Sequence, residues 1–134
     1  MLSRRSFVGM LGAGALVAKA GGGKFRAYIG TYTRGDSKGI YSFILDTAAG
    51  TVTPEGLVAE TENPSFVAIH PNGNYLYAVN ELDKFQGQAS GAVTSFKINH
   101  SSGKLERLND VAAGGTGTCH INITRNGRFA AISN

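Results

Sequence analysis

The sequence predicts an all-β protein made of repeated units, and three observations support this prediction. The segment 63–80 aligns without a gap on the segment 117–134, which follows it by 54 residues. A second pair of segments, 40–46 and 93–99, agrees with the first pair at an offset of 53. Glycine is abundant, with 19 in 134 residues, and helical periodicity is hard to find beyond the N-terminus, which is typical of turn-rich β structure.

A period of roughly 50 residues made of short strands is typical of one blade of a β-propeller. A blade cannot bury both of its faces alone, so it needs neighbouring blades. The repeats amount to about two blades plus part of a third, whereas a closed ring needs about four to eight. We therefore expect the chain to be the N-terminal part of a longer propeller.

Each expected strand is bounded by residues that favour turns. In the second unit Pro71 fixes φ and Asn72-Gly73 accepts positive φ, which predicts a tight turn. Turns ending at Gly50 and Gly103 are expected at matching places, and the polar segment 82–90 is expected to form a loop. The expected strands and extended segments are 25–32, 40–46, 51–54, 57–61, 75–80, 91–99, 105–108 and 129–134, with further strands beginning near 63 and 117.

The first twenty residues have the order of an export signal. Arg4 and Arg5 precede Ser6-Phe7, an apolar run covers 8–18, and Ala18-Lys19-Ala20 fits a cleavage site. The paired arginines resemble the twin-arginine signal of bacteria. This predicts a signal peptide at 1–20, use of the twin-arginine export machinery, and a domain at 21–134 in the periplasm or outside the cell. The run is too short and too rich in glycine for a stable membrane anchor; the alternative is an N-terminal helix of the mature domain.

The charge distribution argues against a nucleic-acid partner. The formal net charge is +4, but Arg4, Arg5 and Lys19 supply three of the 13 basic residues, and the other ten nearly balance nine acidic ones. That is too little for a surface that follows phosphates. Cys119 is the one cysteine, so no internal disulfide is possible, and no zinc-ligand spacing is present. No metal site and no cofactor are predicted.

Several sequence segments resemble the N-terminal part of a known propeller family. They are Tyr28-Ile-Gly-Thr-Tyr-Thr33, Gly39-Ile-Tyr41, Asn63-Pro-Ser-Phe66, His70-Pro-Asn-Gly73, Leu76-Tyr-Ala-Val-Asn-Glu81, Gly117-Thr-Cys-His120, Asn126-Gly-Arg128 and Ser133-Asn134. Together they are similar to the seven-bladed lactonases of the 6-phosphogluconolactonase type, which are related to a muconate lactonizing enzyme. The resemblance implies a seven-bladed β-propeller, monomeric at full length, that hydrolyses the lactone of a sugar acid.

The predicted export signal conflicts with the substrate that gives this family its name. 6-Phosphogluconolactone is a cytoplasmic intermediate, whereas an exported enzyme meets unphosphorylated sugar lactones. The resemblance therefore leaves the lactone open. A second hypothesis from another class is an exported propeller that binds a ligand or protein without catalysis, because the same fold hosts both roles.

His120 is the first candidate for a catalytic residue. Lactone hydrolysis needs a base that activates water and a donor or cation that holds the developing oxyanion. His120 stands where the preceding repeat has Phe66, at the entry to a strand that can face the central channel, and it resembles a histidine of the lactonase family. The alternative is a histidine packed between blades. Neighbouring strand residues point to opposite faces, so Cys119 is expected to be a small buried thiol and not the partner of His120.

Glu81 is the second candidate, because it directly follows a predicted strand and matches the Asn-Glu of the resemblance. It would act as a base or a substrate ligand, and the alternative is a solvated loop charge. Asn80 and Asn134 end equivalent strands and are candidates for substrate binding or for capping turns. His70 and His100 lie in predicted turns and are expected to be exposed to solvent.

Overall fold

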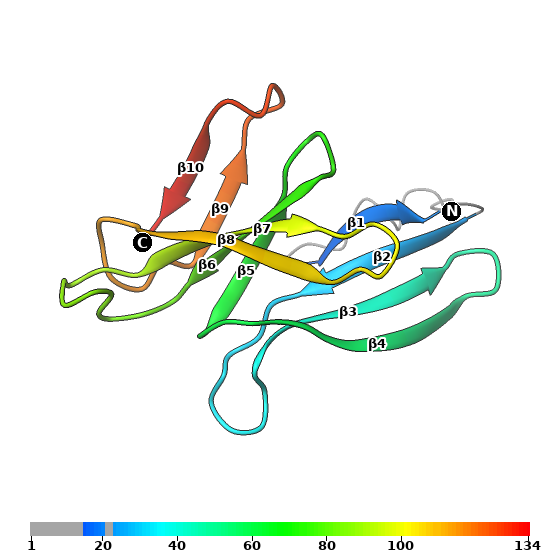
Figure 1. Cartoon of the computed structure of the whole chain (residues 1–134), viewed down its shortest axis with the longest axis horizontal. Coiled ribbons are helices and arrows are strands. Elements are labelled where there is room, and N and C mark those ends of the chain that lie inside the picture. The colour runs from blue at the N-terminus through cyan, green and yellow to red at the C-terminus, as the bar shows by residue number, and fades with distance from the viewer. Residues whose placement is uncertain (1–14, 21–22) are drawn as a thin grey trace, which may run out of the picture.

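The protein is built entirely of strands in the part that the structure describes, which confirms the predicted fold class. The computed structural model describes residues 15–20 and 23–134, and ten strands run through them (Figure 1). They are β1 (Ala15–Ala20), β2 (Lys24–Ile29), β3 (Gly39–Asp46), β4 (Thr51–Glu60), β5 (Pro64–Ile69), β6 (Tyr75–Asn80), β7 (Ala92–Ile98), β8 (Leu105–Ala112), β9 (His120–Ile123) and β10 (Ala130–Ser133).

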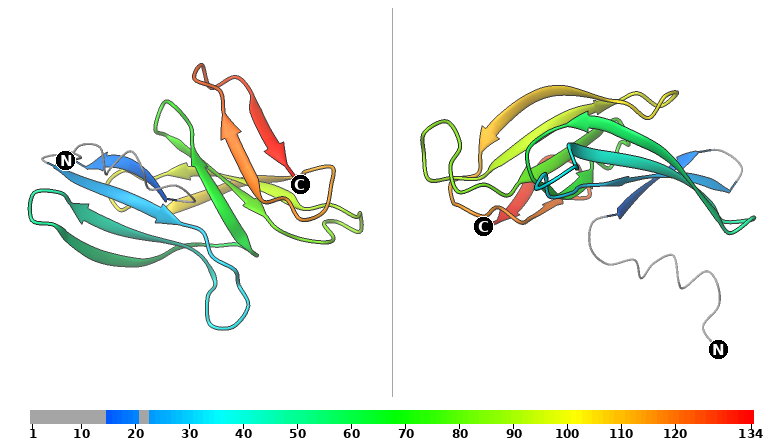
Figure 2. Two further views of the ribbon diagram at one scale, coloured as in Figure 1. Left: turned by 180° about the vertical axis from the view of Figure 1, so that it is seen from behind. Right: turned by 90° about the horizontal axis from the view of Figure 1, so that it is seen from below.

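The strands form two four-stranded sheets and one pair, and consecutive strands are always neighbours. The first sheet has the order β1-β2-β3-β4, the second sheet has the order β5-β6-β7-β8, and β9 pairs with β10. All of these pairings are antiparallel. Figure 2 shows the second sheet between the first sheet and the β9–β10 pair, as expected for successive blades of a propeller.

Backbone geometry confirms the repeat. Gly73 and Gly127 close equivalent turns with φ values of 77° and 70°. Asn63 and Gly117 precede the first strands of their units, and both have positive φ, 41° and 64°. A non-glycine residue at positive φ is uncommon. Asn63 adopts it at the position where the next unit has Gly117, so the two units share this backbone conformation.

The innermost strand of each unit is the one that lies next to its counterpart in the neighbouring unit. β1, β5 and β9 hold the first position in their sheets and contact one another in sequence. β1 falls inside the segment predicted to be a signal peptide, and it pairs with β2 along its whole length. The two arginines of that signal lie outside the described residues, so the signal stays a prediction.

The first two sheets pack face to face over one apolar cluster. Tyr28 and Ile40 of the first sheet are fully buried, and they meet Leu76 and Phe96 of the second sheet. A second cluster lies on the opposite face of the second sheet, where Val79 and Val93 pack against Ile121 of β9. The second sheet is therefore buried on both faces near its inner strands, as an internal blade requires.

Two strands are longer than the sequence predicts. β4 continues from Thr51 to Glu60 through Pro54, where a break was expected. A proline is tolerated there because β4 is an edge strand and needs no ladder donor on its open side. β8 likewise runs on to Ala112. Among residues 15–20 and 23–134 no helix is long and apolar enough to cross a membrane.

Candidate functional site

The loops that follow β2 and β6 meet the segments that lead into β5 and β9 at one end of the sheets. The Asn63 side-chain oxygen accepts hydrogen bonds from the Thr33 backbone amide at 3.0 Å and from its hydroxyl at 3.1 Å. The Asn63 carbonyl accepts the Glu81 amide at 3.0 Å, and the Leu82 carbonyl accepts the Gly117 amide at 3.0 Å. Segments from all three units are thereby tied together at the lower left of Figure 1.

Glycine permits the closest approach at this junction. A Cβ built on Gly30 would stand 1.8 Å from the carbonyl oxygen of Pro64. No side chain fits there, so the end of β2 can lie directly against the start of β5 only because residue 30 is glycine. The loop after Gly30 is then held by the Thr31 hydroxyl, which donates to the Gly39 carbonyl at 2.7 Å.

A polar hollow of about 280 Å³ opens between these segments. Its charged groups come from both sides of the junction: two cations, Arg34 and Lys84, and three carboxylates, Glu62, Glu81 and Asp83. Asn63, Leu82 and Gly117 complete its lining. The hollow thus offers both hydrogen-bond donors and hydrogen-bond acceptors.

Glu81 is a carboxylate of the hollow whose side chain is oriented by a hydrogen bond. It is half-buried, and its Oε2 accepts a hydrogen bond of 2.7 Å from the hydroxyl of Tyr32. Because that bond is to a carboxylate, it raises the pKa of the Tyr32 hydroxyl and keeps it protonated as a donor. One oxygen of Glu81 is therefore fixed in direction, while the residue lines the hollow.

His120 lies on the innermost strand of its unit, as expected. Its side chain is exposed, and its ring lies 4.4 Å from the ring of Phe66 at an angle of 47°. Phe66 is its equivalent one repeat earlier, so the same position in two neighbouring blades forms one contact. The ring thus packs against the neighbouring blade and also reaches solvent, and the catalytic role of His120 stays a prediction.

The structure does not join His120 to Glu81 directly. Among the described residues no hydrogen bond links the two side chains, and His120 is not part of the lining of the hollow. Gly117 does line the hollow, and it precedes His120 by three residues. Both candidates therefore belong to the same end of the sheets, with a gap between them that a ligand or water would have to span.

The expectation for Cys119 is wrong. The thiol is exposed, and its nearest polar partner is the carbonyl of Ser133 at 3.8 Å. The residue directly precedes β9, and its backbone amide donates to the Ser133 carbonyl at 3.0 Å.

Asn80 is buried and its side chain is used inside the protein. The amide nitrogen donates to the Thr61 hydroxyl at 2.8 Å and to the Glu62 carbonyl, and the oxygen lies 2.7 Å from the Thr94 hydroxyl. Only 3% of the residue is exposed, so this amide has no proton left for a substrate. Its equivalent Asn134 is exposed, and its oxygen accepts a hydrogen bond from Thr118 at 2.6 Å.

Of the two turn histidines, only His100 is exposed as expected. His70 is half-buried, and its Nδ1 accepts the Asn72 amide at 3.2 Å. Nε2 of the same ring lies 3.1 Å from the Gly127 carbonyl oxygen. Because Nδ1 accepts a hydrogen bond, Nε2 carries the proton and donates to this carbonyl. The expectation failed because Gly127 belongs to the next unit, and sequence alone does not show which turns of neighbouring blades touch.

Tyr32 was not among the predicted site residues, and Arg34 was expected at a solvated hairpin tip, whereas Arg34 lines the hollow and Tyr32 holds Glu81. The signal was present, because both follow the second strand of the first unit, as Glu81 follows the second strand of the second unit. Loops at equivalent places in a repeat gather at the same end. Among residues 15–20 and 23–134 no group of three or more His, Cys, Asp or Glu side chains could hold a metal ion.

Successive antiparallel blades, with consecutive strands always neighbours in their sheets, define this chain as part of a β-propeller. Residues 26–134 match the family described as "Lactonase, 7-bladed beta-propeller". The chain belongs to this lactonase family.

Relatives and solved structures agree with the family. The chain is 37% identical over 111 residues to the 6-phosphogluconolactonase of Bacillus subtilis, covering 83% of this chain and 30% of the relative. A putative 6-phosphogluconolactonase from Bacteroides fragilis superposes with a TM-score of 0.75 at 32% identity, over 87% of this chain and 31% of that one. The periplasmic gluconolactonase of Pseudomonas aeruginosa superposes with a TM-score of 0.72 at 31% identity, over 83% and 31%. The chain thus spans about three tenths of the length of these proteins.

Proposed function

We propose that this chain is the N-terminal part of an exported seven-bladed lactonase that opens a sugar-acid lactone by water attack. Membership of the lactonase family supports the reaction class. The chain's share of its relatives' length supports the view that further blades complete the ring. The remaining blades would supply the rest of the site around the central channel.

The proposed reaction needs one base and one group that stabilises negative charge. The base takes a proton from water while the water oxygen bonds to the lactone carbonyl carbon, which gives a tetrahedral oxyanion. The bond from that carbon to the ring oxygen then breaks, and the ring oxygen takes a proton to become a hydroxyl. The product is the open sugar acid, which ionises to its carboxylate, and no cofactor is consumed.

The observation that carries the proposal is the half-buried Glu81 carboxylate, fixed by Tyr32 at 2.7 Å on the rim of the polar hollow. We assign Glu81 as the base or as the ligand of a substrate hydroxyl. His120 supplies an exposed imidazole on the innermost strand as a second candidate for proton transfer. Asn134 offers an exposed amide at the same end, whereas the buried Asn80 would act by holding the strand end that carries Glu81.

The test is hydrolysis of gluconolactone and of 6-phosphogluconolactone by the full-length protein, followed by acid release. His120→Ala and Glu81→Gln should each lower kcat by about 10²-fold or more with the fold unchanged. His100→Ala and Glu106→Gln, which alter exposed side chains away from the hollow, serve as controls. An unaltered rate in either site variant removes that residue from the mechanism.

A binding module is the second candidate function. The observation that favours it is the absence of a bond between His120 and Glu81 among the described residues. In that case the full-length protein would bind a sugar lactone or its open acid without turnover. Calorimetric binding together with a rate no faster than the uncatalysed reaction would establish this alternative.

Export is proposed from the sequence and from one relative, because the Pseudomonas aeruginosa protein is a periplasmic gluconolactonase. An exported enzyme would meet unphosphorylated lactones. Replacing Arg4 and Arg5 together by lysine should retain the protein in the cytoplasm, and cell fractionation measures this. Unchanged periplasmic recovery would contradict the twin-arginine route.

The length of the natural protein is tested by sequencing the gene beyond the codon for Asn134. A reading frame that continues through several more repeats supports the lactonase proposal. A stop codon at that point would rule out ring closure by one chain and favour an assembling or inactive protein.

A further inference from the structure

The second sheet contains a chain of polar side chains that begins on its outer strand and ends at the polar hollow. On β8 the guanidinium of Arg107 donates to Asp110, from Nε at 3.1 Å and from Nη2 at 2.6 Å. The Thr94 hydroxyl on β7 lies 2.7 Å from Oδ1 of Asp110 and 2.7 Å from the side-chain oxygen of Asn80 on β6. Thr94 and Asn80 are only 1% and 3% exposed, so the contact between them is shielded from water.

The far end of this polar chain is the segment that leads into β5. The amide nitrogen of Asn80 has two protons, and it donates to the Thr61 hydroxyl at 2.8 Å and to the Glu62 carbonyl. Glu62 lines the hollow, and so does Glu81, which directly follows Asn80. The Asn80 side chain therefore joins the two connections that bring Glu62 and Glu81 to the hollow.

The number of protons gives Thr94 the central place in the polar chain. Its hydroxyl has one proton and lies between two acceptors. Asp110 keeps two hydrogen bonds from Arg107 without it. In residues 15–20 and 23–134 no other group donates to the side-chain oxygen of Asn80. Loss of the Thr94 hydroxyl would therefore leave a buried amide oxygen unpaired, which is costly.

The first sheet forms without such a polar chain. Both sheets have a register irregularity directly after a corresponding serine of their third strand. Tyr41 precedes this serine in the first sheet, and Thr94 precedes it in the second. Their partners on the fourth strand are Leu57 and Asp110. A sheet of this fold therefore does not need the polar chain, which indicates a more specific role in the second sheet.

We propose that Thr94 is a positioning residue for Glu81. Its hydroxyl fixes the Asn80 amide, and that amide fixes the end of β6 against the segment 61–62, so that the Glu81 carboxylate keeps its direction in the hollow. A backbone contact follows the same path, because the Glu81 amide donates to the Asn63 carbonyl at 3.0 Å. The effect on catalysis rests on the function proposed above, whereas the effect on the position of Glu81 does not.

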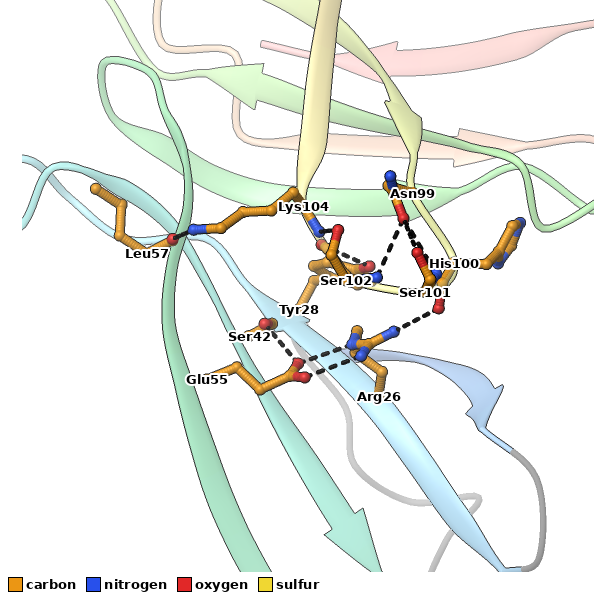
Figure 3. Close-up of polar contacts among 11 residues, drawn as sticks. Arg26, Tyr28, Ser42, Glu55, Leu57, Asn99, His100, Ser101, Ser102 and Lys104 are labelled. Atoms are coloured by element: carbon orange, nitrogen blue, oxygen red, sulfur yellow. Dashed lines mark hydrogen bonds and ion pairs between the residues drawn. The ribbon is translucent and has the colours of Figure 1, made fainter.

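A second polar network supplies a matched control, and it lies where the first sheet meets the turn 99–104 (Figure 3). Arg26 donates to Glu55 from Nε at 2.7 Å and from Nη2 at 2.9 Å, and the Ser42 hydroxyl donates to the same carboxylate at 2.8 Å. Ser42 is buried, and these three residues are outside the lining of the hollow. Ser42→Ala therefore removes a buried hydroxyl beside a carboxylate, as Thr94→Val does, but away from Glu81.

Hydrogen exchange of the full-length protein tests the position of Glu81. Thr94→Val keeps the branched side chain and removes the hydroxyl, and Thr94→Ala gives the same comparison without a methyl group against the two oxygens. In either variant the Glu81 amide should exchange at least about fivefold faster than in the wild type, while the amides of β3 keep their rates. Thr94→Ser should restore slow exchange.

Two results of this experiment would overturn the proposal. One is unchanged exchange at Glu81 in the variants without the hydroxyl. The other is equally fast exchange at Glu81 in Ser42→Ala, because the effect would then reflect a general loss of stability and not the path through Asn80.

Lactone hydrolysis tests the effect on catalysis. Thr94→Val should lower kcat by about tenfold and change KM less, because Glu81 is present but less well aligned. Thr94→Ser should recover most of the rate, and Ser42→Ala should keep it. Fast exchange at Glu81 with an unaltered kcat would overturn the catalytic part of the proposal. If the wild type hydrolyses neither gluconolactone nor 6-phosphogluconolactone, the proposed function fails, and the exchange rates still decide whether Thr94 holds Glu81.

Discussion

At the scale of single residues, the bond between Tyr32 and Glu81 is the contact that bears most directly on function. Tyr32→Phe keeps the ring and removes the hydroxyl that donates to Oε2 at 2.7 Å. The bond is made to a charged group, but solvent weakens it because Tyr32 is exposed. If the full-length protein catalyses the proposed lactone hydrolysis, we expect kcat/KM to fall by about tenfold, mainly in kcat, in steady-state assays.

Tyr41→Phe is the matched control for this experiment. Tyr41 is half-buried on β3, and its hydroxyl accepts the Lys38 amide at 3.2 Å, outside the lining of the hollow. Removing that hydroxyl should leave kcat/KM unchanged. Equal rates for Tyr32→Phe and the wild type would mean that the orientation of Glu81 has no part in the reaction.

Glu55 makes stability depend on pH in the acid range. Hydrogen bonds from Arg26 hold the pKa of Glu55 below its ordinary value of 4.5, and Ser42 adds to the effect. Because the folded pKa is depressed, this stabilisation is present above about pH 4.5 and is lost as pH falls through the folded pKa. Glu55→Gln should lower Tm at pH 7 and flatten the decline of Tm as the pH falls below about 4.5.

The Tm of Glu55→Gln should still fall to some extent at acid pH, because the pKa values of Asp46 and Asp110 are also lowered in the folded protein. The control is Glu106→Gln on β8, an exposed carboxylate. Thermal unfolding followed by circular dichroism at several pH values checks the prediction. A Glu55→Gln curve parallel to that of the wild type would show that the ion pair contributes nothing to the pH dependence.

Individual residues show why sequence predicted some environments and not others. His120 was placed on an inner strand from its match to Phe66, because the repeat fixes strand position. Cys119 and His70 were misplaced, since their exposure depends on which parts of neighbouring units meet. Tyr32 was missed because its partner Glu81 lies 49 residues away in another unit.

At the scale of elements, the turn before β8 tests how the two sheets are joined. Gly103 has φ +75°, and a Cβ there would lie 2.4 Å from Nε of Arg26. Gly50 is its equivalent in the first unit, with φ +69° and no atom within 4 Å of such a Cβ. Gly103→Ala and Gly50→Ala both carry the backbone strain of about 1 kcal/mol, but only Gly103→Ala also displaces Arg26.

We therefore expect Gly103→Ala to destabilise the protein by clearly more than Gly50→Ala in urea unfolding. The difference between the two variants measures the contact between the sheets, because the backbone term is common to both. Equal losses would mean that Arg26 shifts at no cost and that the turn is not held closely by the first sheet.

Strand positions were predictable because alternation and glycine turns are local signals. β6 has the predicted bounds, and β3 and β7 differ from prediction by a residue or so at their ends. β1 was not predicted, since its segment has the composition of an export signal. Its pairing with β2 uses the edge of β2 that β3 leaves free, and sequence alone does not show this. The extensions of β4 and β8 were missed because their residues alternate weakly and are mostly exposed.

At the scale of the whole molecule, the described part exposes surfaces that a closed ring would cover. Leu108, Val111 and Ile132 line one cavity and are 39% to 50% exposed, and Phe129 is 65% exposed. β10 is exposed along its whole length, and it and β4 are sheet edges with unpaired backbone groups. Such edges and apolar faces are sites of association between chains.

We expect residues 21–134, expressed alone, to aggregate or to remain partly unfolded. Size-exclusion chromatography with light scattering and a thermal melt measure this directly. Changing Leu108 and Phe129 to lysine should reduce the association without changing the β content of the circular dichroism spectrum. A monomeric domain with one cooperative transition would instead show that two packed sheets suffice for stability, because the cluster around Tyr28 and Phe96 would then outweigh the uncovered faces.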